Sequence, residues 1–242
     1  MNNSTDLTFI TNEENQNLKN RFEVLIKDTQ LFDCLVGYFY TSGFHSIYES
    51  LEDTEKIRIL IGINTNREVY DLIKKSKKEE PQSFQFSHAE TKQEFENAVE
   101  KELEDSDDNQ KVEKGIIKFT EWLKNKKLEI RAYPTQNIHA KLYIMTFVED
   151  DRDVGRVITG SSNFTQAGLI DNLEFNVELK NRADYEFAKQ KFEELWRDSV
   201  DVSEKYIQTI DNKTWLNQNI TPYELYLKFL YEYFKDELGR TD

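Results

Sequence analysis

One histidine of this chain has neighbours that suit it for chemistry. His139 stands two residues before Lys141, at the start of the apolar run KLYIM. Residues i and i+2 of a strand share a face, so the imidazole and the ammonium group are expected to project together. Histidine changes its charge near neutral pH, so it can attack phosphorus as the neutral base or protonate a leaving oxygen as the cation. The triplet alone is a weak signal of catalysis.

A second group of polar residues lies further along the chain. The run GSSN, at 160–163, follows a strand-like segment, and Glu174 lies in the later strand-like segment 173–179. Taken alone, the run would suit an ordinary turn, because glycine, serine and asparagine favour turns. The two other histidines, His45 and His88, have no reactive neighbours and are expected to be structural or exposed.

Together the two pieces resemble the catalytic motif of the phospholipase D superfamily. The motif is H-x-K, then GSxN, then a glutamate, and it is formed here by His139, Lys141, Gly160, Ser161, Asn163 and Glu174. The longer string GSSNFTQAGLIDNLEFN is similar to the branch of bacterial nucleases that carries a single motif. The resemblance is strong over residues 128–180 and weaker over 31–63.

The resemblance implies a role for each of these residues. His139 would be the nucleophile that forms a covalent phosphohistidine intermediate. Lys141 and Asn163 would hold the nonbridging phosphate oxygens, and Ser161 would add a hydroxyl donor. Glu174 would accept the second imidazole N–H and fix the orientation of the ring. No metal or other cofactor is implied.

This chemistry needs two histidines, one on each side of the scissile bond. One attacks, and the other protonates the leaving group. The chain has a single H-x-K triplet, at His139 and Lys141. A homodimer with a two-fold axis would bring His139 of both subunits to one centre. The alternative is that the second half of the site was lost and that the domain is inactive.

The sequence departs from the family pattern at Thr146. The pattern usually has an aspartate there, and the nearby Asp150, Asp151 and Asp153 fall in a loop. In a regular strand, position 146 faces away from the side that carries His139. An aspartate at this position would therefore be structural, and its absence is expected to leave the nucleophile in place.

Apolar segments that could position these residues follow one another along the chain. Strands are predicted at 31–40, 57–63, 128–133, 141–147, 155–160 and 173–179. Helices are predicted at 13–29, 42–51 with Ser42 as a cap, 66–78, 90–104, 108–127, 182–197, 201–210 and 221–238. Buried strands interleaved with amphipathic helices predict an α/β fold, with a central mixed, largely parallel sheet that helices cover on both faces.

The chain is expected to divide near residue 180. Residues 1–180 would form the phospholipase-D-like catalytic domain, with an acidic helical insertion at about 81–127. Residues 181–242 would form a helical C-terminal extension, or a linker to a further domain. The aromatic-rich C-terminal segment is similar to the linker helix that follows such domains at the N-terminus of bacterial helicase-type proteins.

Charge is spread unevenly over the 242 residues. With 32 basic and 46 acidic residues the net charge is −14, which would normally disfavour a nucleic-acid partner. Residues 111–131, however, hold seven basic and three acidic residues and lead into the strand before His139. A phosphate backbone could lie along this stretch. The predicted substrate-binding residues are Lys124, Lys126, Lys127 and Arg131.

The sequence therefore predicts a metal-independent phosphodiesterase, namely an endonuclease that cleaves DNA. One alternative is a non-catalytic nucleic-acid-binding or assembly module of a larger helicase or restriction-type protein, and a phospholipase is less favoured. The resemblance to helicase-type proteins implies a fused or associated helicase as a partner, and the chain has no phosphate-binding loop of a nucleotide motor of its own. The single cysteine, Cys34, and the lack of a signal-peptide pattern predict a cytoplasmic protein without a membrane partner.

Overall fold

A computed structural model describes residues 8–13, 17–37, 39, 41–62, 110–133, 138–148, 153–204 and 207. The helices predicted at 66–78, 90–104 and 221–238 lie outside the described residues, as does most of the one predicted at 201–210. Within the described part of the chain, no helix combines the length and apolar character that crossing a bilayer would require.

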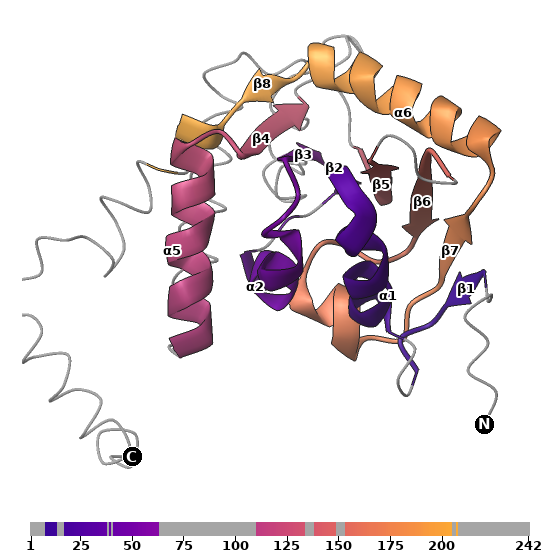
Figure 1. Ribbon diagram of the computed structural model, residues 1–242, viewed down its shortest axis with the longest axis horizontal. Helices are drawn as coiled ribbons and strands as arrows, with labels where there is room; N and C mark the ends of the chain where they lie inside the picture. The colour runs from indigo at the N-terminus through magenta and orange to yellow at the C-terminus, as the bar shows by residue number, and fades with distance from the viewer. Residues whose placement is uncertain are drawn as a thin grey trace, which may run out of the picture.

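The described strands form one eight-stranded sheet in the order β1-β7-β6-β5-β2-β3-β4-β8 (Figure 1). The strands are β1 (Phe9–Ile10), β2 (Thr29–Val36), β3 (Lys56–Gly62), β4 (Leu128–Tyr133), β5 (Leu142–Phe147), β6 (Gly155–Gly160), β7 (Asn176–Leu179) and β8 (Val200–Asp201). All six predicted strands are confirmed, as β2 to β7. The edge strands β1 and β8 were not predicted, because two residues are too few to show a periodic pattern.

The predicted α/β fold with a mixed sheet is confirmed, but the prediction that the sheet is largely parallel is wrong. Among the described strands, only the pairs β2–β3 and β3–β4 are parallel, and the other five pairs are antiparallel. The antiparallel neighbours β5 and β6 are joined only by residues 148–154, and parallel neighbours need crossovers of a dozen or more residues. Parallel pairing is therefore confined to strands that are joined by longer segments.

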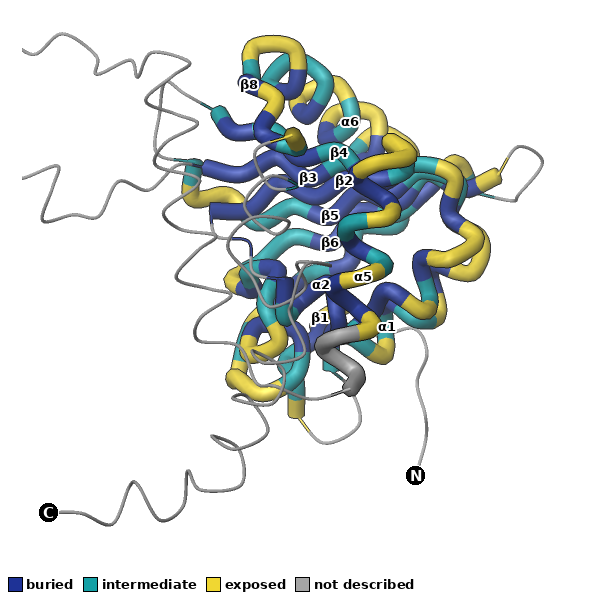
Figure 2. Tube along the Cα trace, turned by 90° about the vertical axis from the view of Figure 1, so that its left-hand side faces the viewer, coloured by how far each residue is buried: buried dark blue, intermediate teal, exposed yellow. Residues whose placement is uncertain are grey.

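Three helices cover one face of the sheet (Figure 1). They are α1 (Leu18–Leu25), α2 (Thr41–Ile47) and α5 (Gln110–Lys124), with 3-10 turns after the first two. In α5 the side chains of Ile116, Phe119, Trp122 and Leu123 are buried, and those of Phe119 and Trp122 pack edge-on against Phe44 of α2. Figure 2 shows the buried strands between these helices and the opposite layer. The part of the predicted insertion that forms α5 thus belongs to the main core.

The opposite face of the sheet is covered by α6 (Arg182–Arg197), as predicted. The side chain of Asn181 caps its first turn by accepting a hydrogen bond from the backbone N–H of Asp184 at 2.9 Å. Phe192 and Trp196 stack on each other and are buried against the sheet. The helix begins directly after the boundary predicted at residue 180, yet it packs on the same sheet as the strands before that boundary.

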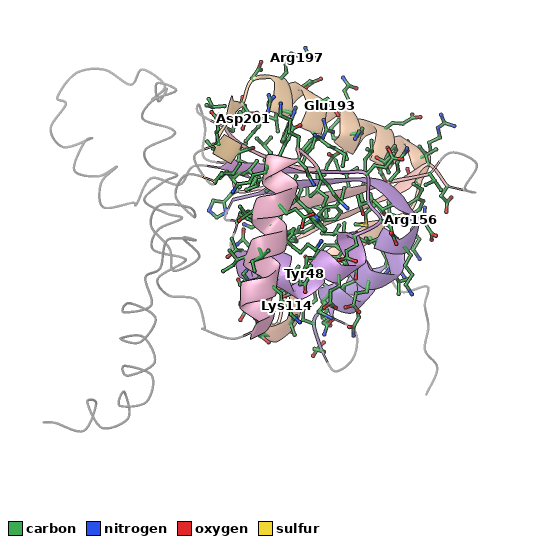
Figure 3. All side chains as sticks on the ribbon, turned by 60° about the vertical axis from the view of Figure 1, so that its left-hand side comes forward. Tyr48, Lys114, Arg156, Glu193, Arg197 and Asp201 are labelled. Atoms are coloured by element: carbon green, nitrogen blue, oxygen red, sulfur yellow. The ribbon has the colours of Figure 1, made fainter. Side chains whose placement is uncertain are left out.

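Ion pairs around the buried Asp33 join α6 to the sheet. Asp33 of β2 is fully buried and accepts hydrogen bonds from Arg58 of β3 at 2.6 and 2.9 Å, and from Lys189 of α6. Arg58 also donates to Glu193, which Figure 3 labels on α6, at 2.6 Å. This hydrogen bond lowers the pKa of the Glu193 carboxyl.

The prediction that Ser42 caps a helix is wrong. The helix α2 begins at Thr41, so Ser42 is its second residue. The Ser42 hydroxyl instead accepts a hydrogen bond from the backbone N–H of Gln166 at 3.4 Å. The side chain therefore links α2 to the turn that follows Asn163.

Candidate active site

His139 and Lys141 lie in segment 138–141, which leads into β5. Strand pairing begins at Leu142, so both residues precede the strand. Their side chains nevertheless converge as predicted. Lys141 Nζ lies 3.1 Å from His139 Nδ1 and donates a hydrogen bond to the His139 carbonyl oxygen at 3.0 Å. His139 is exposed and Lys141 is half-buried, so a substrate can reach the imidazole beside a cation held in place.

This segment crosses the carboxyl ends of the parallel strands β2 and β3, where two glycines make room for it. A Cβ atom on Gly62 would lie 2.6 Å from the carbonyl oxygen of Ile138, and one on Gly37 would lie 3.1 Å from the same atom. A Cβ atom on Gly37 would also lie 3.8 Å from both the His139 Cα and the Asn163 Oδ1. The H-x-K and GSxN pieces therefore meet above Gly37, at the sheet edge where α/β folds commonly bind ligands.

The GSxN turn is anchored through its third residue, Ser162, which is fully buried. Asn176 of β7 accepts from the Ser162 backbone N–H at 3.3 Å and donates to its hydroxyl at 2.9 Å. Tyr143 of β5 donates to the Ser162 carbonyl oxygen at 2.8 Å. Burial raises the pKa of the Tyr143 hydroxyl well above its ordinary value, so Tyr143 remains a donor. Ser161 and Asn163, on either side, lie nearer the surface.

Glu174 lies before β7, which begins at Asn176, so the prediction that it belongs to a strand is wrong. Its carboxylate accepts a hydrogen bond from the Ser161 hydroxyl, and that hydroxyl accepts one from the Phe175 backbone N–H at 3.0 Å. The structure thus brings Ser161 and Glu174 together as a hydroxyl–carboxylate pair. A hydrogen bond from the His139 ring to Glu174 stays a prediction.

Thr146 faces away from this cluster, as predicted. Its hydroxyl lies 2.7 Å from the hydroxyl of Tyr185 on α6. Tyr143, on the same strand, points to the other face, where it reaches Ser162. Of the three nearby aspartates, Asp153 pairs with Arg156, and the other two lie outside the described residues.

The predicted substrate-binding lysines do not lie at this cluster. Lys124, Lys126 and Lys127 lie where α5 ends and β4 begins. The backbone of Lys127 bonds to Ile57 at the start of β3, the end of the strand opposite Gly62. Six residue steps along β3 separate the two ends by about 20 Å.

The side chains of Lys127 and Arg131 are also engaged in internal contacts. The Lys127 ammonium lies 4.2 Å from the centre of the Trp122 ring and donates to the carbonyl oxygen of Glu52. Burial lowers the pKa of Lys127. Arg131 stacks 4.8 Å from the Trp196 ring and donates to the Trp196 carbonyl oxygen at 3.2 Å. These contacts stabilise the packing of α5 and α6.

Three residues that position the cluster were not singled out from the sequence. They are Gly37, Tyr143 and Asn176. A signal existed for Asn176, because a polar residue inside an apolar strand is buried only with hydrogen-bond partners. By contrast, His45 is buried in α2 beside Gly115, in the structural role expected for it.

A family model described as a cardiolipin synthase, PLD-like domain matches residues 36–196, more than half of the chain. The chain belongs to the PLD-like domain family. The matched range includes the whole cluster from Gly37 to Glu174 and nearly all of α6. Membership of this family supports phosphodiesterase-type chemistry for the PLD-like domain described here.

The domain is also similar to several solved structures. Nuc from Salmonella typhimurium, a phospholipase D family member, is 14% identical, with 80% of this chain and 95% of that chain covered and a TM-score of 0.44. Phosphatidylserine synthase from Haemophilus influenzae is 17% identical, with 96% of this chain and 46% of that chain covered and a TM-score of 0.47. TrmBL2, an archaeal chromatin protein, is 16% identical, with 82% of this chain and 56% of that chain covered and a TM-score of 0.39. The chain thus spans about half the length of the last two proteins. A search of curated protein sequences finds no match.

Proposed function

We propose that this PLD-like domain is a metal-independent endonuclease that cleaves DNA through a phosphohistidine intermediate. The observation that carries the proposal is the contact of 3.1 Å between Lys141 Nζ and His139 Nδ1, at the crossing above Gly37 where Asn163 also lies. An exposed imidazole beside a fixed ammonium group suits attack on a phosphodiester, because the cation offsets the charge that builds up on the phosphate. Lys141 and Asn163 would hold the nonbridging oxygens, supported by Ser161 and Glu174.

The proposed reaction has two balanced steps. In the first, the neutral imidazole of His139 forms a bond to phosphorus while the bond from phosphorus to the leaving oxygen breaks. A second, cationic imidazole gives its proton to that oxygen. In the second step, the second imidazole, which is now neutral, takes a proton from water. The water oxygen bonds to phosphorus, and the bond between phosphorus and the nitrogen of His139 breaks. Both imidazoles then have their initial charges.

The second imidazole is proposed to be that of His139 in a second copy of the chain. Neither His45 nor His88 is followed by a lysine two residues later, and His45 is buried. Leu173 and Phe175 flank Glu174 with 67% and 63% of their surfaces exposed. These apolar side chains offer a second copy a surface at the rim of the half-site.

The lysines at the far end of the sheet are proposed to contact DNA away from the scissile phosphate. Lys124 and Lys126 are exposed, and a separation of about 20 Å corresponds to roughly six nucleotides along one strand. Lys127 and Arg131 would contribute mainly by packing on Trp122 and Trp196, which holds α5 and α6 in place. From the single cysteine, Cys34, we also propose a cytoplasmic protein, and from the resemblance alone one that acts with a helicase-type ATPase.

The test is the nicking of supercoiled plasmid DNA in excess chelator. Wild type and His88→Ala, the matched control, should nick the plasmid, whereas His139→Ala should lose at least about 10² to 10⁴ in single-turnover rate. Glu174→Gln should lose less than His139→Ala. Thermal melting would first establish that each variant is folded.

Two results would contradict the proposal. One is cleavage that stops in chelator and returns with magnesium, and the other is cleavage by His139→Ala at the wild-type rate. Turnover of phosphatidylcholine vesicles without nicking of DNA would assign the site to a phospholipase.

A further inference from the structure

The N-terminal segment of the described chain runs along the loop that carries Glu174. The carbonyl oxygen of Thr8 accepts from the backbone N–H of Glu178 at 2.8 Å, and that of Thr11 accepts from Glu174 at 3.3 Å. Between these two contacts, β1 pairs antiparallel with β7. The segment therefore lines one side of the backbone on which Glu174 sits.

Asn12 follows Thr11, the last residue of this segment that bonds to the Glu174 backbone. Its carboxamide both donates and accepts hydrogen bonds. Its Nδ2 donates to the carbonyl oxygens of Gly168 at 2.9 Å and Asn172 at 3.0 Å, while its Oδ1 accepts from the backbone N–H of Leu18 at 2.8 Å. Its φ of 61° lies in the left-handed region, which asparagine and aspartate adopt more readily than most residues. Asn12 thus joins the start of α1 to two points of the loop between Asn163 and Glu174.

The contact with Gly168 extends to Asn163. A Cβ atom on Gly168 would lie 2.4 Å from the carbonyl oxygen of Asn163 and 3.1 Å from its backbone nitrogen, so the two backbones are in direct contact. The backbone N–H of Gly168 also donates to the Thr165 hydroxyl at 3.0 Å, within the same turn. A bond to the Gly168 carbonyl therefore limits the movement of Asn163 as well.

We propose that Asn12 is a positioning residue of the candidate active site. It holds the loop at Gly168 and at Asn172, and so keeps Asn163 and Glu174 in place relative to His139. It acts through these residues and touches no substrate. Its effect on catalysis rests on the proposed phosphodiesterase function, whereas its effect on the loop does not.

The key variant is Asn12→Asp. Aspartate keeps the size, the backbone preference and the acceptor for Leu18, but it places an oxygen against two carbonyl oxygens. The matched control is Asn17→Asp, which makes the same change of charge at the N-cap of α1, where Asn17 accepts from Asn20 at 2.8 Å and aspartate caps equally well. Asn181→Ala, which removes the cap of α6, controls for a general loss of stability.

Hydrolysis of bis(4-nitrophenyl) phosphate measures the catalytic effect. Asn12→Asp should lower kcat about 10- to 100-fold with little change in KM, because small misplacements of catalytic groups cost rates of this order. Asn17→Asp and Asn181→Ala should keep kcat near the wild-type value. An equal loss of kcat in Asn181→Ala and Asn12→Asp would overturn the proposal.

Amide hydrogen exchange of peptides covering 163–174 gives a readout that needs no activity. Exchange should be faster in Asn12→Asp than in wild type and unchanged in Asn17→Asp. Unchanged exchange in Asn12→Asp would overturn the proposal. If wild type hydrolyses no phosphodiester, the proposed function fails, and the exchange measurement still decides whether Asn12 holds the loop.

Discussion

Tyr143 and Thr146 lie on the same strand, β5, and serve opposite faces of the sheet. Tyr143 reaches the turn that carries Ser161 and Asn163 through the carbonyl oxygen of Ser162. Thr146 reaches the hydroxyl of Tyr185 on α6. Thr146 therefore contributes to the packing of α6, on the face of the sheet away from the candidate active site.

Thr146→Val tests this division. Valine has nearly the same shape, so the variant should lose only the hydrogen bond to Tyr185. The free energy of unfolding should fall by about 1 kcal/mol, and kcat should stay near the wild-type value. The matched control is Thr159→Val, because the Thr159 hydroxyl donates to the Lys141 carbonyl oxygen at 2.8 Å. Thr159→Val should lower kcat. An equal loss of kcat in Thr146→Val and Thr159→Val would refute the assignment of Thr146 to helix packing. Urea unfolding and steady-state kinetics give the two quantities.

At the scale of elements, the ion pairs of Arg58 fasten α6 to the centre of the sheet. Arg58 lies between Asp33 and Glu193, and its guanidinium also lies 4.9 Å from the centre of the Phe192 ring. The helix is thus held by charge as well as by apolar contact. Since β2 ends at Val36, directly before Gly37 under the cluster, the network also fixes the strand that supports the site.

The lowered pKa of Glu193 makes this contribution depend on pH. A carboxyl whose pKa is lower in the folded state stabilises the fold fully above its ordinary pKa of about 4.3, and the stabilisation is lost as the pH falls through the lowered value. Glu193→Gln should therefore reduce the free energy of unfolding by about 0.5–1 kcal/mol at pH 7, a modest value because the side chain is partly exposed. The difference should shrink below about pH 4.

Urea unfolding at pH 7 and pH 3.5 measures the difference. Glu186→Gln is the control, since Glu186 pairs with Arg182 on the exposed side of the same helix. A Glu193→Gln deficit that is equal at both pH values would rule out the titration of Glu193 as its source.

At the scale of the whole molecule, the apolar rim beside Glu174 bears on assembly. Phe175 is 63% exposed there, while its backbone is fixed by Ser161. A second copy that covered this rim would bring two half-sites close together. The oligomeric state and the activity should therefore change together.

Phe175→Glu should convert a dimer into a monomer and abolish cleavage, because it places a charge in the proposed contact. Phe187→Glu is the matched control, since Phe187 is 65% exposed on α6, and it should remain an active dimer. Light scattering at micromolar concentration should give twice the chain mass of 28.8 kDa for wild type and the single mass for Phe175→Glu. A monomeric Phe175→Glu that still cleaves DNA at the wild-type rate would exclude a shared site.

The sequence predicted what depends on short spacings. The meeting of His139 with Lys141, and the opposite orientation of Thr146, both follow from counting residues along an extended segment. The pairing of the strands depends on connections and register across the whole sheet, so the mixture of parallel and antiparallel neighbours was misjudged. Arg131 was predicted to bind substrate because it lies close to His139 in the sequence. Its packing on Trp196 depends on how α6 covers the sheet, which that closeness does not indicate. The part played by Asn12 involves residues far away in the sequence, and no local pattern indicates it.

The contacts of Asn12 have a consequence for the time at which the site can form during synthesis. Its partners Gly168 and Asn172 lie 156 and 160 residues further along the chain, and a bond between Arg21 and Glu178 spans 157 residues. At a translation rate of about 5–20 residues per second, roughly 8–30 s pass between the synthesis of Asn12 and that of Asn172. On the ribosome, a nascent chain already contains His139 and Lys141 before the residues that Asn12 binds have been made. The candidate active site can therefore be completed only once Asn172 has been made, which is later than His139 itself.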